Sequence, residues 1–363
     1  MRSDLMALTA LASLGGMGPK RLAAAVARHG PAGALERLRS GRRLDVEAPA
    51  TVATGWVAEA SALDLEVLAA DLAASGIVVS SPGDPDHPRR LADDIDPVPV
   101  LFRRGRPVEN DLLTVGIVGT RRCTSLGREV ARELGFGLAA AGVVVVSGLA
   151  LGIDGAAHVG AVAAAGAPPL AFVGGGVDVV YPARHGDLWE SVARAGTIMA
   201  EAPPGAAPAR WRFPARNRLI AAVADIIVVV ESRRAGGSML TVDEAIRRDR
   251  QVMAVPGSVR NPAAVGTNAL LADGCAPVTS VDDVLLALGL RALSGPAQVV
   301  EPTVEADLPE PLASVYAAVD DGATSLDAVV VATGHPPLEV LAAVGELAGR
   351  GLVVDDGTGI RRT

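Results

Sequence analysis

The amino-acid sequence predicts an α/β protein built around a doubly wound, mostly parallel β-sheet. From about residue 73 onward, short apolar runs alternate with segments of helical periodicity, which is the pattern of successive β-α-β units. Glycine and proline cluster where these runs end, and such sheets bind their ligands there. The strand-like runs are Thr114–Val118, Val143–Ser147, Leu170–Val173, Thr197–Ala200, Ile226–Glu231 and Val252–Val255.

The first 72 residues predict a small helical domain, because alanine and leucine recur at helical spacing without a strand-like run. Within it, Leu14–Lys20 reads Leu-Gly-Gly-Met-Gly-Pro-Lys and places a turn between two helical patterns. This turn resembles that of a helix-hairpin-helix motif, whose backbone amides can touch a DNA phosphate. An ordinary helix–helix turn with Pro19 at the start of the second helix is an equally good interpretation.

The C-terminal residues predict a further small unit. Residues 293–308 contain proline, glutamate and serine with little periodicity, so we expect a linker between a central domain of residues 73–292 and a last domain of residues 309–363. Three short helices and a β-hairpin are expected in that last domain, which is the order of elements in a winged helix. The expected helices are Leu312–Val319, Ser325–Val331 and Pro337–Arg350, and the hairpin turns at Asp355–Gly357.

Composition narrows the class of protein. A net charge of −8 argues against a general nucleic-acid coat, although a local basic patch can still bind a polyanion. Cys123 and Cys275 match no zinc or redox spacing, which points to a reducing compartment. The sequence shows no signal pattern, and its longest strongly apolar run, Ile226–Val230, is far too short for a membrane. We therefore expect a soluble cytoplasmic protein.

The loop that follows the second strand-like run is the clearest ligand signal. Ser147–Asp154 lies between a β-branched strand and an alanine-rich helix, Asp154–Ala165. Gly148 and Gly152 allow close backbone approach, and Ser147 adds a hydroxyl, so the loop suits a phosphate at a helix N-terminus. Asp154 could serve as a base, but a helix N-cap is its expected role.

The loop after the first run, within Gly116–Gly127, is a second candidate. The strand ends at Gly119 and a helix begins near Ser125. The segment lacks a full G-x-G-x-x-G and has no clear acidic ribose ligand, so it does not indicate NAD. Arg121 and Arg122 suit an anion, and the alternative is that both are solvated loop arginines.

The segment Arg210–Arg218 concentrates positive charge and aromatic rings. Four arginines occur in nine residues without an acid, in a chain with only 2% aromatic residues. Guanidinium groups hold phosphates and aromatic faces accept bases. We expect Trp211 in the core, Phe213 at the mouth of the site, and an extended backbone before Pro214. The candidate ligands are Arg212, Phe213, Arg216, Asn217 and Arg218, of which Arg216 and Asn217 open an expected helix at Ala215–Ala224.

Two further glycine loops follow the next strand-like runs. Gly236, Gly237 and Ser238 make an anion-capable loop, and Pro256–Gly257 is followed by a Gly-Thr-Asn helix start in Gly266–Gly274. Several such loops at one sheet edge predict a long polyanion-binding groove rather than a pocket for one dinucleotide. No catalytic constellation is evident, and we expect no cofactor and no metal. The histidines are not at metal-ligand spacing, and they are His158 (expected to be structural), His185 and His335.

These elements, in this order, resemble the DNA-processing protein A family (DprA, also called Smf). The resemblance covers nearly all of residues 98–290. The matching stretches are Gly116–Gly127, Ser147–Asp154, Gly176–Pro182, Phe213–Ile220, Gly236–Thr241 and Gly266–Gly274.

The resemblance implies an extended Rossmann fold that binds single-stranded DNA, forms a homodimer and helps to load the RecA recombinase in natural transformation. It places Arg121 and the segment Phe213–Arg218 on the DNA path. The helical N-terminal domain and the winged-helix-like C-terminal domain also fit the family. We accordingly predict a non-enzymatic recombination mediator that protects incoming single-stranded DNA and has no membrane partner.

One departure from the family pattern leaves a second function open. After Thr241 the family continues with a helix of small residues, whereas this chain has a charged one, Val242–Arg250. The resulting Gly236–Glu244 is similar to the Gly-Gly-x-Gly-Thr-x-x-Glu of LOG-type nucleotide phosphoribohydrolases, but it is one residue too long. An N-glycoside hydrolase with Glu244 as catalytic carboxylate is therefore one alternative, and a sensor of a small phosphorylated ligand is another.

Overall fold

The computed structural model describes residues 2–290, 308–350, 352–355 and 359–362. The chain divides into two compact units, residues 1–293 and 294–363. Apart from Leu308, the linker expected at residues 293–308 lies outside the described residues. The predicted division of the first unit into residues 1–72 and 73–292 stays a prediction, because the helices and the sheet form one compact body.

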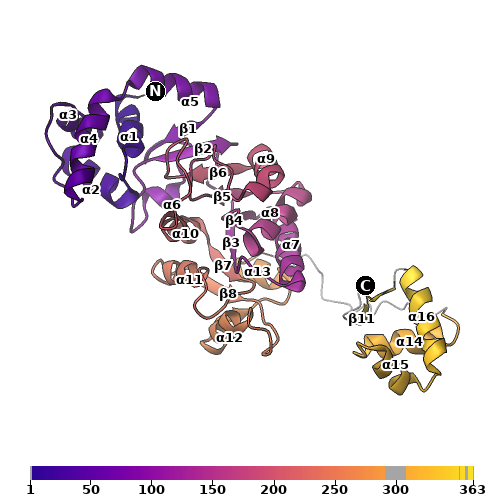
Figure 1. Ribbon diagram of the computed structural model, residues 1–363. Coiled ribbons are helices and arrows are strands. Elements are labelled where there is room, and N and C mark those ends of the chain that lie inside the picture. Colours follow the sequence, from indigo (N-terminus) through magenta and orange to yellow (C-terminus); the bar gives the residue numbers. More distant parts are fainter. Residues whose placement is uncertain (1, 291–307, 351, 356–358, 363) are drawn as a thin grey trace. The chain divides into compact units, whose positions relative to one another are not determined.

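A nine-stranded sheet organises the first unit, in the order β1-β2-β6-β5-β4-β3-β7-β8-β9 (Figure 1). The strands from β6 to β9 pair in parallel, while β1 and β2 are antiparallel additions at one edge. The predicted doubly wound, mostly parallel sheet is confirmed. The strands are β1 (Val78–Ser80), β2 (Leu101–Gly105), β3 (Thr114–Val118), β4 (Val144–Ser147), β5 (Leu170–Phe172), β6 (Thr197–Ala200), β7 (Ile226–Val229), β8 (Gln251–Ala254) and β9 (Ala276–Pro277).

Helices cover both faces of the sheet, so the strands are buried on both sides (Figure 1). Helices α7 (Ser125–Ala140), α8 (Ile153–Ala164) and α13 (Val281–Ala287) pack on one face. The other face is covered by α6 (Arg89–Ala92), α10 (Arg212–Val223), α11 (Met239–Ile246) and α12 (Val265–Ala272). The chain runs from β3 outward to β6 and then returns to place β7 beside β3, which creates a ligand crevice at the carboxyl ends of these strands.

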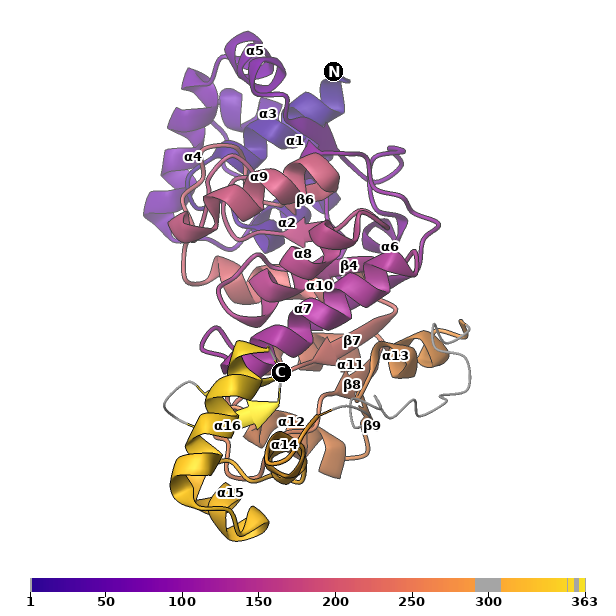
Figure 2. The ribbon, with the colours of Figure 1, turned by 90° about the vertical axis from the view of Figure 1, so that its right-hand side faces the viewer.

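The N-terminal helices gather at the β1 edge of the sheet, as Figures 1 and 2 both show. They share an apolar core with α9 (Gly186–Ala195), which follows the short 3-10 turn η1 (Ala183–His185). Pro19 is the first residue of the second helix, as predicted, and the Trp56 indole N–H donates to the Gly15 carbonyl at 2.8 Å, which anchors the turn between the first two helices. The helices are α1 (Ser3–Ser13), α2 (Pro19–His29), α3 (Pro31–Arg39), α4 (Ala50–Ala62) and α5 (Leu65–Ser75).

The second unit has its own apolar core and contains the three predicted helices. These are α14 (Leu312–Asp320), α15 (Leu326–Thr333) and α16 (Pro337–Gly349), followed by the antiparallel pair β10 (Val353–Asp355) and β11 (Ile360–Arg362). Of the predicted hairpin turn, residues 356 and 357 lie outside the described residues. Among the described residues no single helix is long and apolar enough to cross a bilayer, while the bent pair α15–α16 meets that test by length and composition alone.

Candidate nucleic-acid interface

An open cleft of about 690 Å³ lies at the carboxyl ends of the central strands. Its walls come from the loops after β3, β4 and β7 and from the first turns of α10 and α11. The structure thus brings together most of the segments in which the sequence predicted a polyanion groove, whereas Pro256–Gly257 and Gly266–Gly274 do not line the cleft. The predicted residues that line the cleft are Gly119, Arg121, Arg122, Phe213, Arg216, Asn217, Gly236, Gly237 and Ser238, whereas Gly148 lines a smaller hollow beside it.

Four exposed arginines line this cleft: Arg121, Arg122, Arg210 and Arg233. Within the described parts of the chain, no carboxylate lies within ion-pair distance of any of them. Unneutralised guanidinium groups in a cleft make it attractive to a chain of phosphates. Sequence reasoning did not single out Arg233, although its position just after an apolar strand was an available signal.

Two aromatic rings lie beside these arginines. The Arg121 guanidinium carbon is 4.8 Å from the centroid of the Phe213 ring, and the Tyr181 ring centroid is 5.5 Å from the same ring. Phe213 is half-buried and Tyr181 is 45% exposed. Phe213 therefore lies at the mouth of the site, as predicted, and Tyr181 was missed. Such a pair offers an aromatic surface on which a base can stack next to a phosphate-binding charge.

The backbone of Phe213 differs from the prediction. An extended conformation was expected before Pro214, but Phe213 is the second residue of α10, which begins at Arg212. Pro214 is tolerated there because the N–H groups of the first helical turn have no intrahelical partner. The expectation that Trp211 is a core residue is also wrong, since its side chain is 52% exposed.

The amides of the Ser147–Gly152 loop face a carboxyl group of the protein itself, that of Asp154 in the first turn of α8. Asp154 is buried, and the N-cap of α8 is Gly152, so the predicted cap role is wrong. Burial raises the pKa of Asp154, while the charges of Arg216 and Arg121 and backbone hydrogen bonds from Ala150 and Gly148 act in the opposite direction. The amides that were expected to hold a phosphate thus face Asp154.

Ser147 and Gly152 serve the packing of this loop. The Ser147 hydroxyl is buried and donates to the Ile117 carbonyl at 2.6 Å. Gly152 has φ +82°, and a Cβ there would collide with the Thr120 carbonyl, so only glycine fits where the loops after β3 and β4 touch. Both residues fix the shape of the cleft, and neither of them lines it.

In the loop after β3 the backbone amide of the helix N-terminus is likewise bound by a carboxyl group of the protein, that of Glu231. This buried side chain accepts hydrogen bonds from the backbone N–H of Thr124 at 2.9 Å and from its hydroxyl at 2.7 Å. Thr124 is the N-cap of α7, so a carboxylate of the protein occupies the site where a dinucleotide fold binds a phosphate. Sequence reasoning read Glu231 only as the end of a strand.

The loop after β7 is partly engaged. The Ser238 hydroxyl is buried and donates to Ser232 Oγ at 2.8 Å, and the Gly236 N–H donates to the Arg233 carbonyl. Gly237 is exposed, and its carbonyl accepts a hydrogen bond from Asn217 Nδ2 at 3.2 Å. Gly236, Gly237, Ser238 and Asn217 all line the cleft, and of these Gly237 is the exposed residue.

Arg216 is a buried residue rather than an exposed one. Only 5% of it is exposed, its Nη1 donates to the Phe172 carbonyl, and a Cβ on Gly148 would collide with its guanidinium group. Burial lowers the pKa of Arg216 to about 10, and the charge of Asp154 opposes that shift. The expectation that Arg216 opens a helix is wrong, because α10 begins a full turn earlier.

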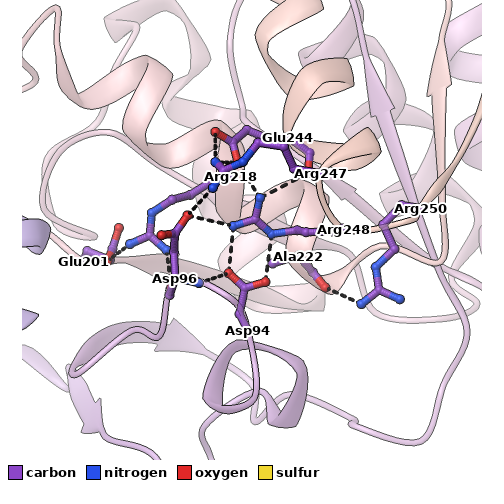
Figure 3. A network of polar contacts seen from close by, with 9 residues as sticks. All are labelled: Asp94, Asp96, Glu201, Arg218, Ala222, Glu244, Arg247, Arg248 and Arg250. Atoms are coloured by element: carbon purple, nitrogen blue, oxygen red, sulfur yellow. Dashed lines mark hydrogen bonds and ion pairs between the residues drawn. The ribbon is translucent and has the colours of Figure 1, made fainter.

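Arg218 and Arg212 also have partners within the protein. Arg218 is a largely buried residue that pairs with Glu201 and donates to the Asp96 carbonyl at 3.0 Å (Figure 3). Arg212 donates to the Ala207 carbonyl at 2.9 Å, and its guanidinium carbon is 5.2 Å from the centroid of the Trp211 ring. Of the four arginines in Arg210–Arg218, only Arg210 is exposed without a protein partner among the described residues.

Figure 3 shows that Glu244, the alternative catalytic carboxylate, belongs to a network of ion pairs. It pairs with Arg247 and Arg248, and Arg248 in turn holds Asp94 through two hydrogen bonds of 2.7 and 2.8 Å. Glu244 does not line the arginine cleft. In the described ranges no cluster of side chains suits a metal ion. His158 is buried with its Nε2 near the Leu170 carbonyl, which agrees with the expected structural role.

The fold and the cleft together define a class of protein: a doubly wound α/β protein whose ligand edge presents unpaired arginines beside aromatic rings. Residues 78–289 match the model of the family described as DNA recombination-mediator protein A. This chain belongs to that family, and the predicted resemblance to DNA-processing protein A is confirmed.

Named relatives and solved structures agree. A DNA processing protein DprA of Mycobacterium tuberculosis is 41% identical over 241 residues, which make up 64% of this chain and 60% of that protein. Protein Smf of Synechocystis is 32% identical over 306 residues, covering 75% of this chain and 77% of that protein. The DprA structure from Streptococcus pneumoniae has a TM-score of 0.64 at 26% identity and covers 78% of this chain and 98% of that one.

A second DprA structure, from Helicobacter pylori, is described for its single-stranded DNA binding mode. It has a TM-score of 0.53 at 26% identity and covers 58% of this chain and 95% of that one.

Proposed function

We propose that this protein binds single-stranded DNA without sequence preference and acts as a recombination mediator. The observation that carries the proposal is the set of unpaired arginines, Arg121, Arg122, Arg210 and Arg233, around the Phe213 and Tyr181 rings. The arginines contact phosphates, and the rings stack on bases, which are accessible in a single strand and are already stacked on one another in a duplex. Relatives named as DNA processing proteins support this assignment.

The proposal includes the steps that the family resemblance implies: protection of incoming single-stranded DNA, help in loading RecA during natural transformation, and action as a homodimer in the cytoplasm. Both cysteines are free thiols, as a protein of a reducing compartment would have. A DprA structure described for its single-stranded DNA binding mode supports the DNA partner.

A binding protein is favoured over the nucleotide hydrolase and the phosphate sensor. Either rival needs a cradle of free backbone amides for a single phosphate. Here Glu231 and Asp154 face those amides in the loops after β3 and β4. Glu244, which the hydrolase would need in the site, is ion-paired outside the cleft.

A competition titration tests the proposal. A labelled single strand of about 20 nucleotides is displaced by unlabelled single strand, by duplex of the same sequence, and by nucleoside monophosphates, with release of free base assayed in the last mixture. We expect single strand to displace the probe much better than duplex, and monophosphates to leave it bound and to stay intact. Equal displacement by duplex, or release of base, would overturn the proposal.

A matched pair of variants locates the interface in the same titration. Arg233→Ala removes an exposed cation from the cleft, whereas Arg128→Ala removes an exposed cation from α7 that does not line it. Only the first variant should bind the single strand more weakly.

A further inference from the structure

A second hollow, of about 940 Å³, lies between the α1–α2 turn and the start of α10. Gly18, Pro19 and Lys20 line it from the helical side, and Trp211 and Pro214 line it from the sheet side. Pro214 also lines the arginine cleft, so the two hollows adjoin. Both walls were predicted from the sequence to be of interest, one as a turn that can touch a DNA phosphate and the other as an arginine-aromatic segment. Neither the turn nor Trp211 lines the arginine cleft.

Trp211 is the side chain that distinguishes this hollow. The chain has three tryptophans, and Trp56 and Trp189 are fully buried while Trp211 is 52% exposed. A Cβ placed on Gly18 would lie 3.4 Å from the Trp211 ring, so the turn supports the indole closely. An exposed ring that is held in place by a turn provides a stacking surface with little conformational freedom to lose.

Two cations that line the hollow, Lys20 and Arg21, have no carboxylate partner among the described residues. Lys20 is exposed in the first turn of α2, and Arg21 donates to the carbonyls of Gly16 and Glu47. In the part of the chain that the structure describes, neither cation pairs with a carboxylate. The acids that line the hollow, Asp96 and Glu244, are both paired with the two arginines that directly follow α11, Arg247 and Arg248 (Figure 3).

We propose that a single strand bound in the arginine cleft continues over Pro214 into this hollow, where a base stacks on Trp211 and Lys20 and Arg21 contact the backbone phosphates. The N-terminal helical hairpin is then part of the DNA path and lengthens the footprint on the strand. A polyanion with exposed bases fits an aromatic surface beside unpaired cations, and the hollow opens directly from the proposed interface. This inference rests on the proposed function.

Tryptophan fluorescence tests it on the intact protein, because Trp211 is the exposed tryptophan. Oligo-dT of about 6 and about 20 nucleotides is titrated against the wild-type chain and followed by anisotropy of the DNA and by fluorescence of the protein. We expect both strands to bind, but only the longer one to quench fluorescence strongly.

Two variants and a control complete the test. Trp211→Ala and Lys20→Ala should weaken binding of the longer strand, the first by about five-fold or more, and leave the short strand unaffected. Arg42→Ala removes an exposed cation of the same helical region outside the hollow and should change neither. Trp211 packs against the turn, so its loss can destabilise the protein. If Trp211→Ala has a lowered melting temperature, the affinity of Lys20→Ala for the longer strand is the deciding measurement.

The outcomes separate the two proposals. If the wild-type chain binds neither strand, the proposed function itself fails. If it binds both, while Lys20→Ala and Trp211→Ala keep full affinity for the longer strand and no quenching occurs, the DNA path does not include the hollow. A protein partner that quenches Trp211 where DNA does not would also overturn the inference.

Discussion

Two arginine-rich regions lie on neighbouring parts of the sheet, and they differ in what faces their guanidinium groups. In the cleft, Arg121, Arg122, Arg210 and Arg233 are exposed and have no carboxylate partner among the described residues. In the network of Figure 3, Arg218 and Arg248 are buried and held by acids. The same residue type thus stabilises the fold in one region and is available for a ligand in the other.

What separates the two regions is the source of the acids. The carboxylates of the network come from distant segments, with Asp94 and Asp96 on the loop before β2 and Glu201 after β6. The acids near the cleft, Asp154 and Glu231, accept hydrogen bonds from groups of the loops, and neither forms an ion pair with an exposed arginine, although the charge of Arg121 acts on Asp154.

Removal of the central network cation should have the largest effect. Arg248→Met leaves Asp94 buried without its partner, since their side chains are only 2% and 5% exposed. We expect the free energy of unfolding to fall by about 3–5 kcal/mol, as when one member of a buried ion pair is lost. Urea denaturation measures this loss, and DNA affinity of the folded protein should be unchanged.

Arg247→Met is the control, because the Arg247 side chain is 52% exposed in its ion pairs. It should lower stability by no more than about 1 kcal/mol. Equal losses in the two variants would show that the network does not act as a buried structural unit.

Acidification should lower stability through the buried histidines. Burial lowers the pKa of His158 to about 4 from its ordinary value of 6.5. At this side chain the unfolded chain binds a proton that the folded chain does not, so the stability that His158 contributes is lost as the pH falls from about 6.5 toward 4, by up to about 3 kcal/mol. Glu201 acts in the opposite direction, because burial raises its pKa to about 7.

His158→Gln should remove the part of the stability loss on acidification that this side chain causes, when denaturant titrations of the variant and the wild-type chain are compared at several pH values. Some dependence should remain, because burial also lowers the pKa of His87 to about 4. An unchanged pH profile in the variant would show that His158 is not kept neutral by burial.

Loss of the cleft ring comes next. Phe213→Ala should weaken single-strand binding by about 1–3 kcal/mol, and similarly for dT and dA oligomers, because stacking tolerates any base. Thermal melting and DNA titration of the same variant check this. A large fall in melting temperature with affinity preserved in the folded protein would show that the ring serves packing alone.

The smallest effect is expected in the salt dependence. Arg121→Ala and Arg233→Ala each remove one phosphate contact, so the slope of log affinity against log salt should flatten by about 0.7 per variant. Melting temperature should not change, since both side chains are exposed. Wild-type slopes in both variants would remove these arginines from the DNA path.

The central fold could be predicted from the sequence because its strands are uniform apolar runs. Every run that was predicted corresponds to a strand from β3 to β8. Strand β2, in the antiparallel part of the sheet between β1 and β6, was missed, since Arg103 and Arg104 interrupt its apolar pattern. The charge of buried Arg103 is balanced by an ion pair with Asp86. This partner could not be predicted from the sequence, because the pair forms only when the antiparallel strands are in place.

The location of the site could also be predicted, since glycine loops after parallel strands meet at one sheet edge. The roles of single residues could not. Arg216 and Arg210 lie six residues apart in one segment, yet one is buried under Gly148 and the other is exposed. That difference depends on where α10 begins and on which loop packs over it, and neither is encoded in local periodicity.

The two carboxyl groups inside the phosphate-type loops have a consequence for competition among ligands. Asp154 and Glu231 already face the backbone amides that would otherwise bind a single phosphate, so a free nucleotide gains little binding energy in the cleft. A strand gains from several separate arginine contacts at once, and its advantage grows with each phosphate that follows the first. On the proposed function, the cleft therefore selects ligands by the number of phosphates that they carry, and a dilute single strand can occupy it in the presence of many free nucleotides.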